Sequence, residues 1–177
     1  EWDFDYLDVE QLNEGLLRGE FDVAKASFHA ALHLSDRYGV FASGSALGHG
    51  NGPLLLASPD FVRQWLASAQ NVRGFDSIDA NGLYERHLAK RRPVFDVEPT
   101  LSALPLPPEA RTLCPGRRTT ATFLFRTTFP ELPEPRQAIF SEIMPAVRDG
   151  GADLGVCIHE GRFTWHEQDL ACICLLY

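Results

Sequence analysis

The sequence lacks several features that would assign it quickly to a class of protein. No apolar run among its 177 residues approaches the ~20 residues of a membrane span. No positively charged leader with an apolar core opens the chain. Basic residues are scarce, since 16 Lys and Arg face 24 Asp and Glu, and the formal net charge is −8. Because an acidic surface repels phosphate groups, we expect no nucleic acid and no membrane as a partner.

Common cofactor and hydrolase motifs are also missing. The glycines of 44–52 recur at every second position from Gly48 on, which is not a dinucleotide fingerprint, and no Gly-x-Ser-x-Gly elbow occurs. The four cysteines form no Cys-x-x-Cys pair, and His29 and His33 have no third ligand near them. We therefore expect no metal and no cofactor. Cys114 and Cys157 lie in apolar runs, so we expect them to be buried free thiols, which fits a reducing compartment.

What the sequence does contain is the composition of a packed globular protein, with 45% apolar and 23% charged residues. The length allows one large domain or two small lobes. The chain begins at Glu1 without methionine and stops inside the apolar run that ends at Tyr177. Natural termini are usually polar, so we expect a chain that is incomplete at both ends.

Strand-like and helix-like segments alternate along the chain, which indicates an α/β fold. Apolar spacing and capping residues predict helices over 11–17, 30–38, 59–66, 83–90, 121–128 and 139–148. Short apolar runs predict strands over 4–9, 21–28, 40–43, 53–57, 111–114 and 154–158. Residues 16–29 and 146–159 share the order helix, glycine, Asp, apolar strand, His. This repeat is consistent with two similar lobes, although it is also common in any α/β protein.

Three short segments could carry chemistry. His159 and Glu160 follow an apolar strand, and the carboxyl ends of strands line ligand sites in α/β sheets. Histidine suits a general base because its unperturbed pKa is about 6.5. A surface histidine in a turn is the alternative.

The segment 115–120 sits between a predicted strand and a predicted helix, so its N–H groups could bind a carboxylate or phosphate. The alternative is a simple helix cap by Thr119 or Thr120. In the third segment, Lys25 could supply positive charge and Ser27 a hydrogen bond to a ligand. A solvated lysine and a helix-capping serine are the alternatives there.

Taken together, four segments resemble the 1,4-dihydroxy-6-naphthoate synthase family of the futalosine route to menaquinone. They are DVAKASFHA at 22–30, SGSALGHGNGPL at 43–54, PGRRTTA at 115–121 and IHEGRFTW at 158–165. Their order along the chain is the order in the family, and the region from the first segment to the last covers most of the chain.

The resemblance implies a cytoplasmic enzyme with a two-lobed fold like that of type II periplasmic binding proteins and a cleft between the lobes. The first lobe would cover 1–52, the second 53–158, and 159–177 would return toward the first. The enzyme would be a lyase that converts a small-molecule substrate, cyclic dehypoxanthinyl futalosine, to 1,4-dihydroxy-6-naphthoate without metal or cofactor. His159 matches the family's proton acceptor. The residues that match its substrate contacts are Lys25, Ala26, Ser27, Thr119 and Thr120.

Two other functions stay open. The chorismate dehydratase of the same pathway shares the fold, although the His-Glu segment and the Ser-Phe-His strand favour the synthase. A solute-binding protein that captures a small carboxylate without chemistry is the alternative from another class. The sequence leaves the oligomeric state open.

Overall fold

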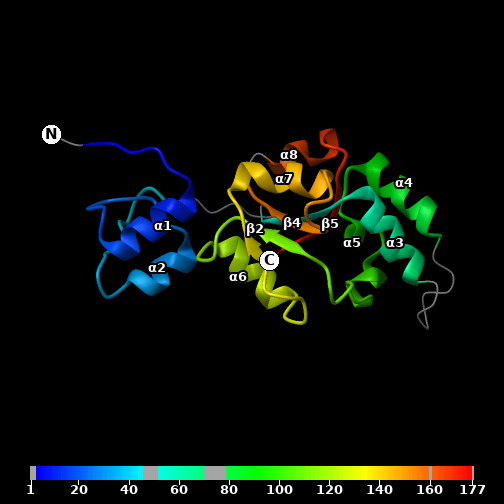
Figure 1. The fold of residues 1–177 in the computed structure, drawn as a ribbon, viewed down its shortest axis with the longest axis horizontal. Coiled ribbons are helices and arrows are strands. Elements are labelled where there is room, and N and C mark those ends of the chain that lie inside the picture. The colour runs from blue at the N-terminus through cyan, green and yellow to red at the C-terminus, as the bar shows by residue number, and fades with distance from the viewer. Residues whose placement is uncertain (1–2, 46–51, 70–78, 160, 177) are drawn as a thin grey trace.

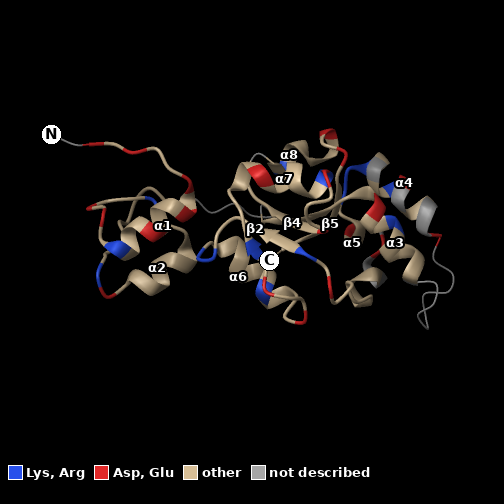
Figure 2. Ribbon diagram, viewed as in Figure 1, with Lys and Arg blue, Asp and Glu red and all other residues tan. Residues whose placement is uncertain are grey.

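The computed structural model describes residues 3–45, 52–69, 79–159 and 161–176. Its centre is one five-stranded mixed sheet in the order β3-β2-β4-β1-β5 (Figure 1). The strands are β1 (Leu54–Ala57), β2 (Thr112–Cys114), β3 (Arg136–Gln137), β4 (Leu154–Cys157) and β5 (Ala171–Leu175). Apart from β3, the strands carry no charged residue (Figure 2). This composition fits a sheet that is covered on both faces.

The strand directions bring several chain segments to one edge of the sheet. β2 runs parallel to both β3 and β4, whereas β1 is antiparallel to β4 and to β5. Strands β2, β3, β4 and β5 therefore all end at the same edge, which we call the carboxyl edge. β1 begins there, because Leu54 pairs with Cys157 and with Leu175.

Helices cover the two faces of the sheet. α7 (Phe140–Arg148), α8 (Gly161–Thr164) and the 3-10 turn η2 (Trp165–Glu167) lie on one face, where Ile143, Val147 and Trp165 join its core. The other face packs against α3 (Pro59–Ala69), α4 (Ala80–Lys90), α5 (Val94–Val97), the 3-10 turn η1 (Pro99–Ala103) and α6 (Thr120–Thr128). Residues 52–176 with their sheet and these helices are called the sheet body.

Residues 3–45 form a separate layer, called the helical pair, at one end of the molecule (Figure 1). It contains α1 (Val9–Arg18) and α2 (Phe28–Leu34), whose buried core consists of Leu16, Ala30 and Leu34. The sequence signals at α1 act as predicted. Asp8 caps the helix in a capping box with Gln11. Gly19 ends it at φ 76°, a left-handed conformation that glycine adopts without strain.

Three predicted strands in the helical pair are wrong. Residues 4–8 and 40–43 have no regular structure and Val9 already begins α1, whereas 21–27 is irregular and leads into α2 at Phe28. A strand needs a neighbour for its backbone hydrogen bonds, and none pairs with these segments in the part described. The sequence repeat at 16–29 and 146–159 therefore corresponds to the same structure only at its helix, and not at its strand. Its second copy forms α7 and β4, whereas its first copy forms α1 without a strand.

The sheet body follows the sequence more closely. Strands over 53–57, 111–114 and 154–158 are confirmed as β1, β2 and β4, and four predicted helices are confirmed as α3, α4, α6 and α7. The prediction missed β5, which pairs with β1 as a buried edge strand. Residues 46–51 of the glycine-rich stretch lie outside the described residues. No helix in the described ranges is both long and apolar enough to cross a lipid bilayer.

Candidate functional site

The carboxyl edge of the sheet collects two of the predicted site segments. The turn 115–119 leaves β2, and His159 follows β4. Since β2 and β4 are parallel neighbours, with Leu113 opposite Gly155, both segments leave the sheet on the same side. The topology therefore brings together two pieces of sequence that lie far apart along the chain.

His159 sits in an unusual backbone conformation. Its φ is 53°, a left-handed value that is uncommon for residues other than glycine and recurs at functional sites. Its side chain is exposed. The imidazole ring and the ring of Phe140 pack edge to face, with 5.6 Å between their centroids. The carbonyl of His159 accepts the N–H of Arg162 at 3.3 Å, which fixes the turn. Glu160 lies outside the described residues.

Thr119 is the N-cap of α6 and is buried. Its hydroxyl donates to the carbonyl of Gly116 at 2.8 Å and accepts the N–H of Thr122 at 3.2 Å. The structure thus gives this hydroxyl the capping role that the sequence left open. Thr120 faces the helical pair, where its Oγ1 accepts the backbone N–H of His29 at 3.4 Å.

A carboxylate of the chain itself occupies the turn before α6. The Oε1 and Oε2 atoms of Glu10 accept the backbone N–H of Arg118 at 3.0 and 3.3 Å. Gly116 permits this approach, because its φ is 129° and a Cβ there would lie 2.5 Å from the Cβ of Glu10. The Arg118 guanidinium also pairs with Glu14. One N–H group of the turn therefore binds a carboxylate in this structure, and that carboxylate belongs to Glu10.

Ser27 is the N-cap of α2 and joins that helix to the turn. Its hydroxyl donates to the carbonyl of Arg118 at 2.6 Å and accepts the N–H of Ala30 at 3.1 Å. Lys25 is exposed, and Ala26 packs partly buried against the small core of the helical pair. The structure thus brings 25–27 together with 118–120. In the described ranges, no hydrogen bond connects the His159 ring to either segment.

Two hollows occur away from these segments. One of about 360 Å³ lies along α1, and the residues that line it include Leu7, Glu14 and Phe21. Another of about 670 Å³ lies at the opposite edge of the sheet, beside Arg63, Arg148 and others. Glu10 lines the first hollow, but none of the six predicted site residues lines either of them.

The four cysteines are free and buried, as expected for Cys114 and Cys157. Burial raises the pKa of the Cys114 thiol to about 12 and that of Cys174 to about 12. These thiols are therefore protonated near neutral pH and are poor nucleophiles. Over the described ranges, no group of three or more His, Cys, Asp or Glu side chains is placed to hold a metal ion.

Sequence reasoning missed three polar residues. Glu10 and Asn13 lie on the first turns of α1, and Asn13 is fully buried. A polar side chain on the apolar face of a helix was the available signal. His87 of α4 is also buried, stacks on Trp165 at 5.3 Å and accepts the N–H of Cys172 on Nε2 at 3.2 Å. Burial lowers its pKa, so the ring is neutral.

The fold and site thus define an α/β protein whose candidate site is built from loops at the carboxyl edge of a mixed sheet. The sequence model of a family described as "Menaquinone biosynthesis" matches residues 1–69 and 88–176. The chain belongs to this family. Residues 70–87, which include most of α4, fall between the two matched ranges.

Two curated relatives share the name 1,4-dihydroxy-6-naphtoate synthase. The protein from Thermus thermophilus is 30% identical over 158 residues, which cover 89% of this chain and 42% of the relative. The protein from Streptomyces coelicolor is 30% identical over 174 residues, covering 95% of this chain and 46% of the relative. The chain thus spans less than half the length of either relative.

A solved structure supports the fold. The crystal structure of a protein from Archaeoglobus fulgidus superposes with a TM-score of 0.64 at 25% sequence identity. It covers 96% of this chain, and this chain covers 47% of it.

Proposed function

We propose that the chain is part of a 1,4-dihydroxy-6-naphthoate synthase, a carbon–carbon lyase that acts on cyclic dehypoxanthinyl futalosine in the cytoplasm. The names of both curated relatives support this activity over chorismate dehydration, and the menaquinone biosynthesis family supports either enzyme over solute capture. The observation that carries the proposal is the meeting of His159 and the turn 115–119 at one edge of the sheet. The proposed arrangement is two-lobed, as in type II periplasmic binding proteins, with 1–52 belonging to the first lobe and 53–158 to the second. Residues 161–176 lie within the predicted return toward the first lobe, 159–177, but β5 instead pairs with β1 in the sheet body, so we group them with the second lobe.

In the proposed reaction, His159 is the general base. It removes a hydroxyl or carbon-bound proton, and the bond to the sugar-derived part of the substrate then breaks. Its exposed ring and its fixed backbone turn suit this role, because the ring can reach a ligand while its Cα stays in place. Phe140 limits the rotation of the ring from one side.

The substrate contacts are proposed at 25–27 and at the start of α6. The first N–H groups of a helix have no partner within the helix, so those of Thr120 and Ala121 can bind a carboxylate. Lys25 adds an exposed positive charge. Since the hydroxyls of Ser27 and Thr119 cap helices and their N–H groups donate to Asn13 and to Gly116, we propose that these two residues contribute mainly by fixing the positions of the two segments.

The test is turnover of cyclic dehypoxanthinyl futalosine, followed by the appearance of the naphthoate in a chromatographic assay. Replacing His159 by Ala should lower kcat by about 10²–10⁴-fold, the usual effect of removing a general base. His166→Ala is the matched control, because His166 is a partly buried histidine of η2 that lies beside the hollow at the opposite edge. Absence of turnover by the complete protein that contains this chain would contradict the activity, and normal turnover by its His159→Ala variant would contradict the role of His159.

A further inference from the structure

A partly buried polar network connects the two proposed substrate-binding segments. Asn13 stands at its centre with no exposed surface. Its Oδ1 accepts the backbone N–H of Ser27 at 3.1 Å. Its Nδ2 donates to Oε2 of Glu10 at 3.1 Å and, more weakly, to Oγ of Ser27 at 3.4 Å. One side chain thus contacts both the cap of α2 and the carboxylate that holds the other segment.

The second half of the network runs through Glu10. Its carboxylate accepts the backbone N–H of Arg118, one residue before the cap of α6. Ser27 completes the network, because its hydroxyl donates a hydrogen bond to the carbonyl of the same Arg118 at 2.6 Å. Both polar groups of the Arg118 peptide backbone are therefore held by side chains of the helical pair. Asn13 is the only one of the three side chains that touches the other two.

Such a network fixes position because its members depend on one another. A hydroxyl has one donor and two acceptor sites, and all three of Ser27 are in use. Both N–H groups of the Asn13 amide are also in use. A buried polar group that loses its partner bears its full desolvation cost, so a half-formed network is worse than none. The two segments are therefore held in one relative arrangement.

We infer that Asn13 is a positioning residue for the substrate site. It holds the backbone of 25–27 directly, and through Glu10 it holds the turn that leads to Thr119 and Thr120. This inference rests on the proposed function for the identity of the two segments. The network itself is independent of that function and can be tested separately.

The first measurement is binding of 1,4-dihydroxy-6-naphthoate to the full chain by calorimetry, at a temperature where circular dichroism shows every variant folded. We expect Asn13→Ala to raise Kd by about tenfold, since it removes hydrogen bonds to both segments. Asp8→Ala is the matched control, because Asp8 caps the same helix and contacts neither segment. It should lower the unfolding midpoint and leave Kd within about twofold.

A second variant separates positioning from simple loss of stability. Asn13→Asp keeps an acceptor for Ser27 but sets a carboxylate against Glu10, with Glu14 and Arg118 as the other charged groups nearby. Protonation of the new carboxyl restores a donor. The Kd of Asn13→Asp divided by the Kd of the unmodified chain should therefore decrease as the pH is lowered from about 8 to about 5. A constant ratio would overturn the inference.

The third measurement needs no ligand. Amide hydrogen exchange at Ser27 and Arg118 should become faster in Asn13→Ala and stay unchanged in Asp8→Ala. Unchanged exchange at both amides would overturn the positioning role, as would faster exchange with an unchanged Kd. If the unmodified chain fails to bind the naphthoate, the proposed function is contradicted, and exchange alone then decides the role of Asn13.

Discussion

The helical pair and the sheet body are stabilised by different means. The sheet body buries two large apolar clusters, one on each face of its sheet, with side chains such as Leu55, Trp65 and Ile143 almost completely covered. The helical pair buries only Leu16, Ala30 and Leu34, while large apolar side chains on it stay exposed. The exposed ones include Phe4, Tyr6, Val23, Phe28, Leu32, Val40 and Phe41.

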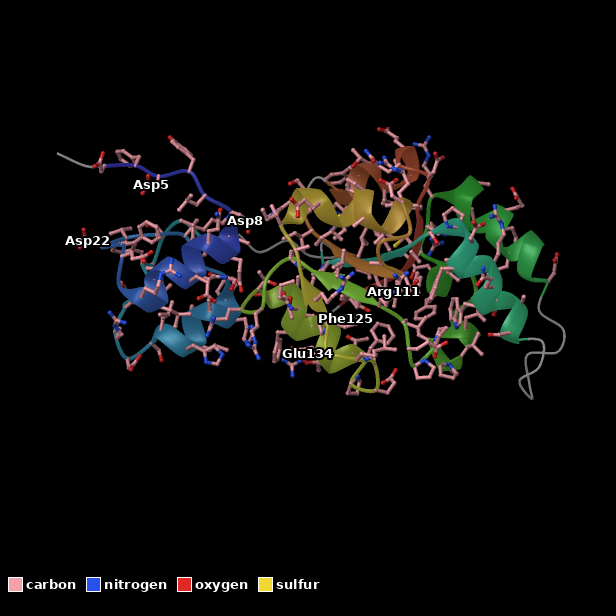
Figure 3. All side chains as sticks on the ribbon, viewed as in Figure 1. Asp5, Asp8, Asp22, Arg111, Phe125 and Glu134 are labelled. Atoms are coloured by element: carbon pink, nitrogen blue, oxygen red, sulfur yellow. The ribbon has the colours of Figure 1, made fainter. Side chains whose placement is uncertain are left out.

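The difference shows how each region keeps its shape. Apolar burial alone is enough to define the sheet body, because the hydrophobic contribution grows with the area removed from water. The helical pair has too small a core for that and is instead anchored by directional hydrogen bonds to the cap of α6. The start of α1, marked by Asp8, faces the sheet body, so its first turn supplies these bonds (Figure 3). Two of the three candidate site segments, 25–27 and the turn before α6, lie at this junction.

The largest expected effect tests the apolar core of the sheet body. Leu55→Ala should lower the free energy of unfolding by about 2–5 kcal/mol, because it leaves a cavity in the central strand β1. Urea denaturation followed by circular dichroism measures it. Leu32→Ala on α2 is the control, and its exposed side chain predicts a change within about 0.5 kcal/mol. Equal losses for both variants would contradict the contrast between the two regions.

An intermediate effect tests the junction. Thr119→Ala should cost about 1–2 kcal/mol, because it removes a buried N-cap and the hydroxyl that holds the carbonyl of Gly116. The loss should be accompanied by faster amide exchange at Arg118, next to the cap. Thr127→Ala in the last turn of the same helix is the control, since its exposed hydroxyl only bonds back to Phe123. If both variants cost the same, the cap does not matter at the junction.

The smallest effect concerns an ion pair at the far edge of the sheet body. Arg111 donates from Nε and Nη2 to the two oxygens of Asp153, at 3.0 and 2.8 Å, and this hydrogen bonding lowers the pKa of Asp153. Because the pair is partly exposed, Asp153→Asn should cost only about 0.5–1 kcal/mol near neutral pH.

The pH dependence of that pair has a definite sign. The folded-state pKa of Asp153 is lower than its unfolded value, so the contribution is complete above the unfolded pKa and is lost as the pH falls through the folded one. The difference in unfolding free energy between the unmodified chain and Asp153→Asn should therefore shrink on acidification. A difference that grows at low pH would show that the pair is not its source.

Local signals explain which elements were predictable. The capping box at Asp8, the threonine cap at Thr119 and the glycine at Gly19 act within a few residues of their own position, so the sequence reveals them. The buried strands β1, β2 and β4 were visible as short apolar runs. The errors fell on apolar residues without a pairing partner, such as Val40 and Phe41, which are exposed instead of forming a strand.

The candidate site was predictable in part for the same reason. The residue types and the family resemblance identified His159, the turn before α6 and the stretch 25–27. That Glu10 and Asn13 hold two of these segments together could not be read from the sequence, because residues 10 and 118, and residues 13 and 27, meet only when the chain is folded. The substrate roles of Lys25, Ala26, Ser27, Thr119, Thr120 and His159 remain predictions.

The sequence by itself determined the family, the α/β class and most helix boundaries, since these depend on residue types and on spacings of a few positions. Only the tertiary structure decided which segments become neighbours. It placed His159 and the turn after β2 at one sheet edge through parallel pairing, and it set the Glu10 carboxylate on the N–H of Arg118. The physical reason is that strand pairing and buried hydrogen bonds join residues that are distant along the chain, and no local pattern records such partners.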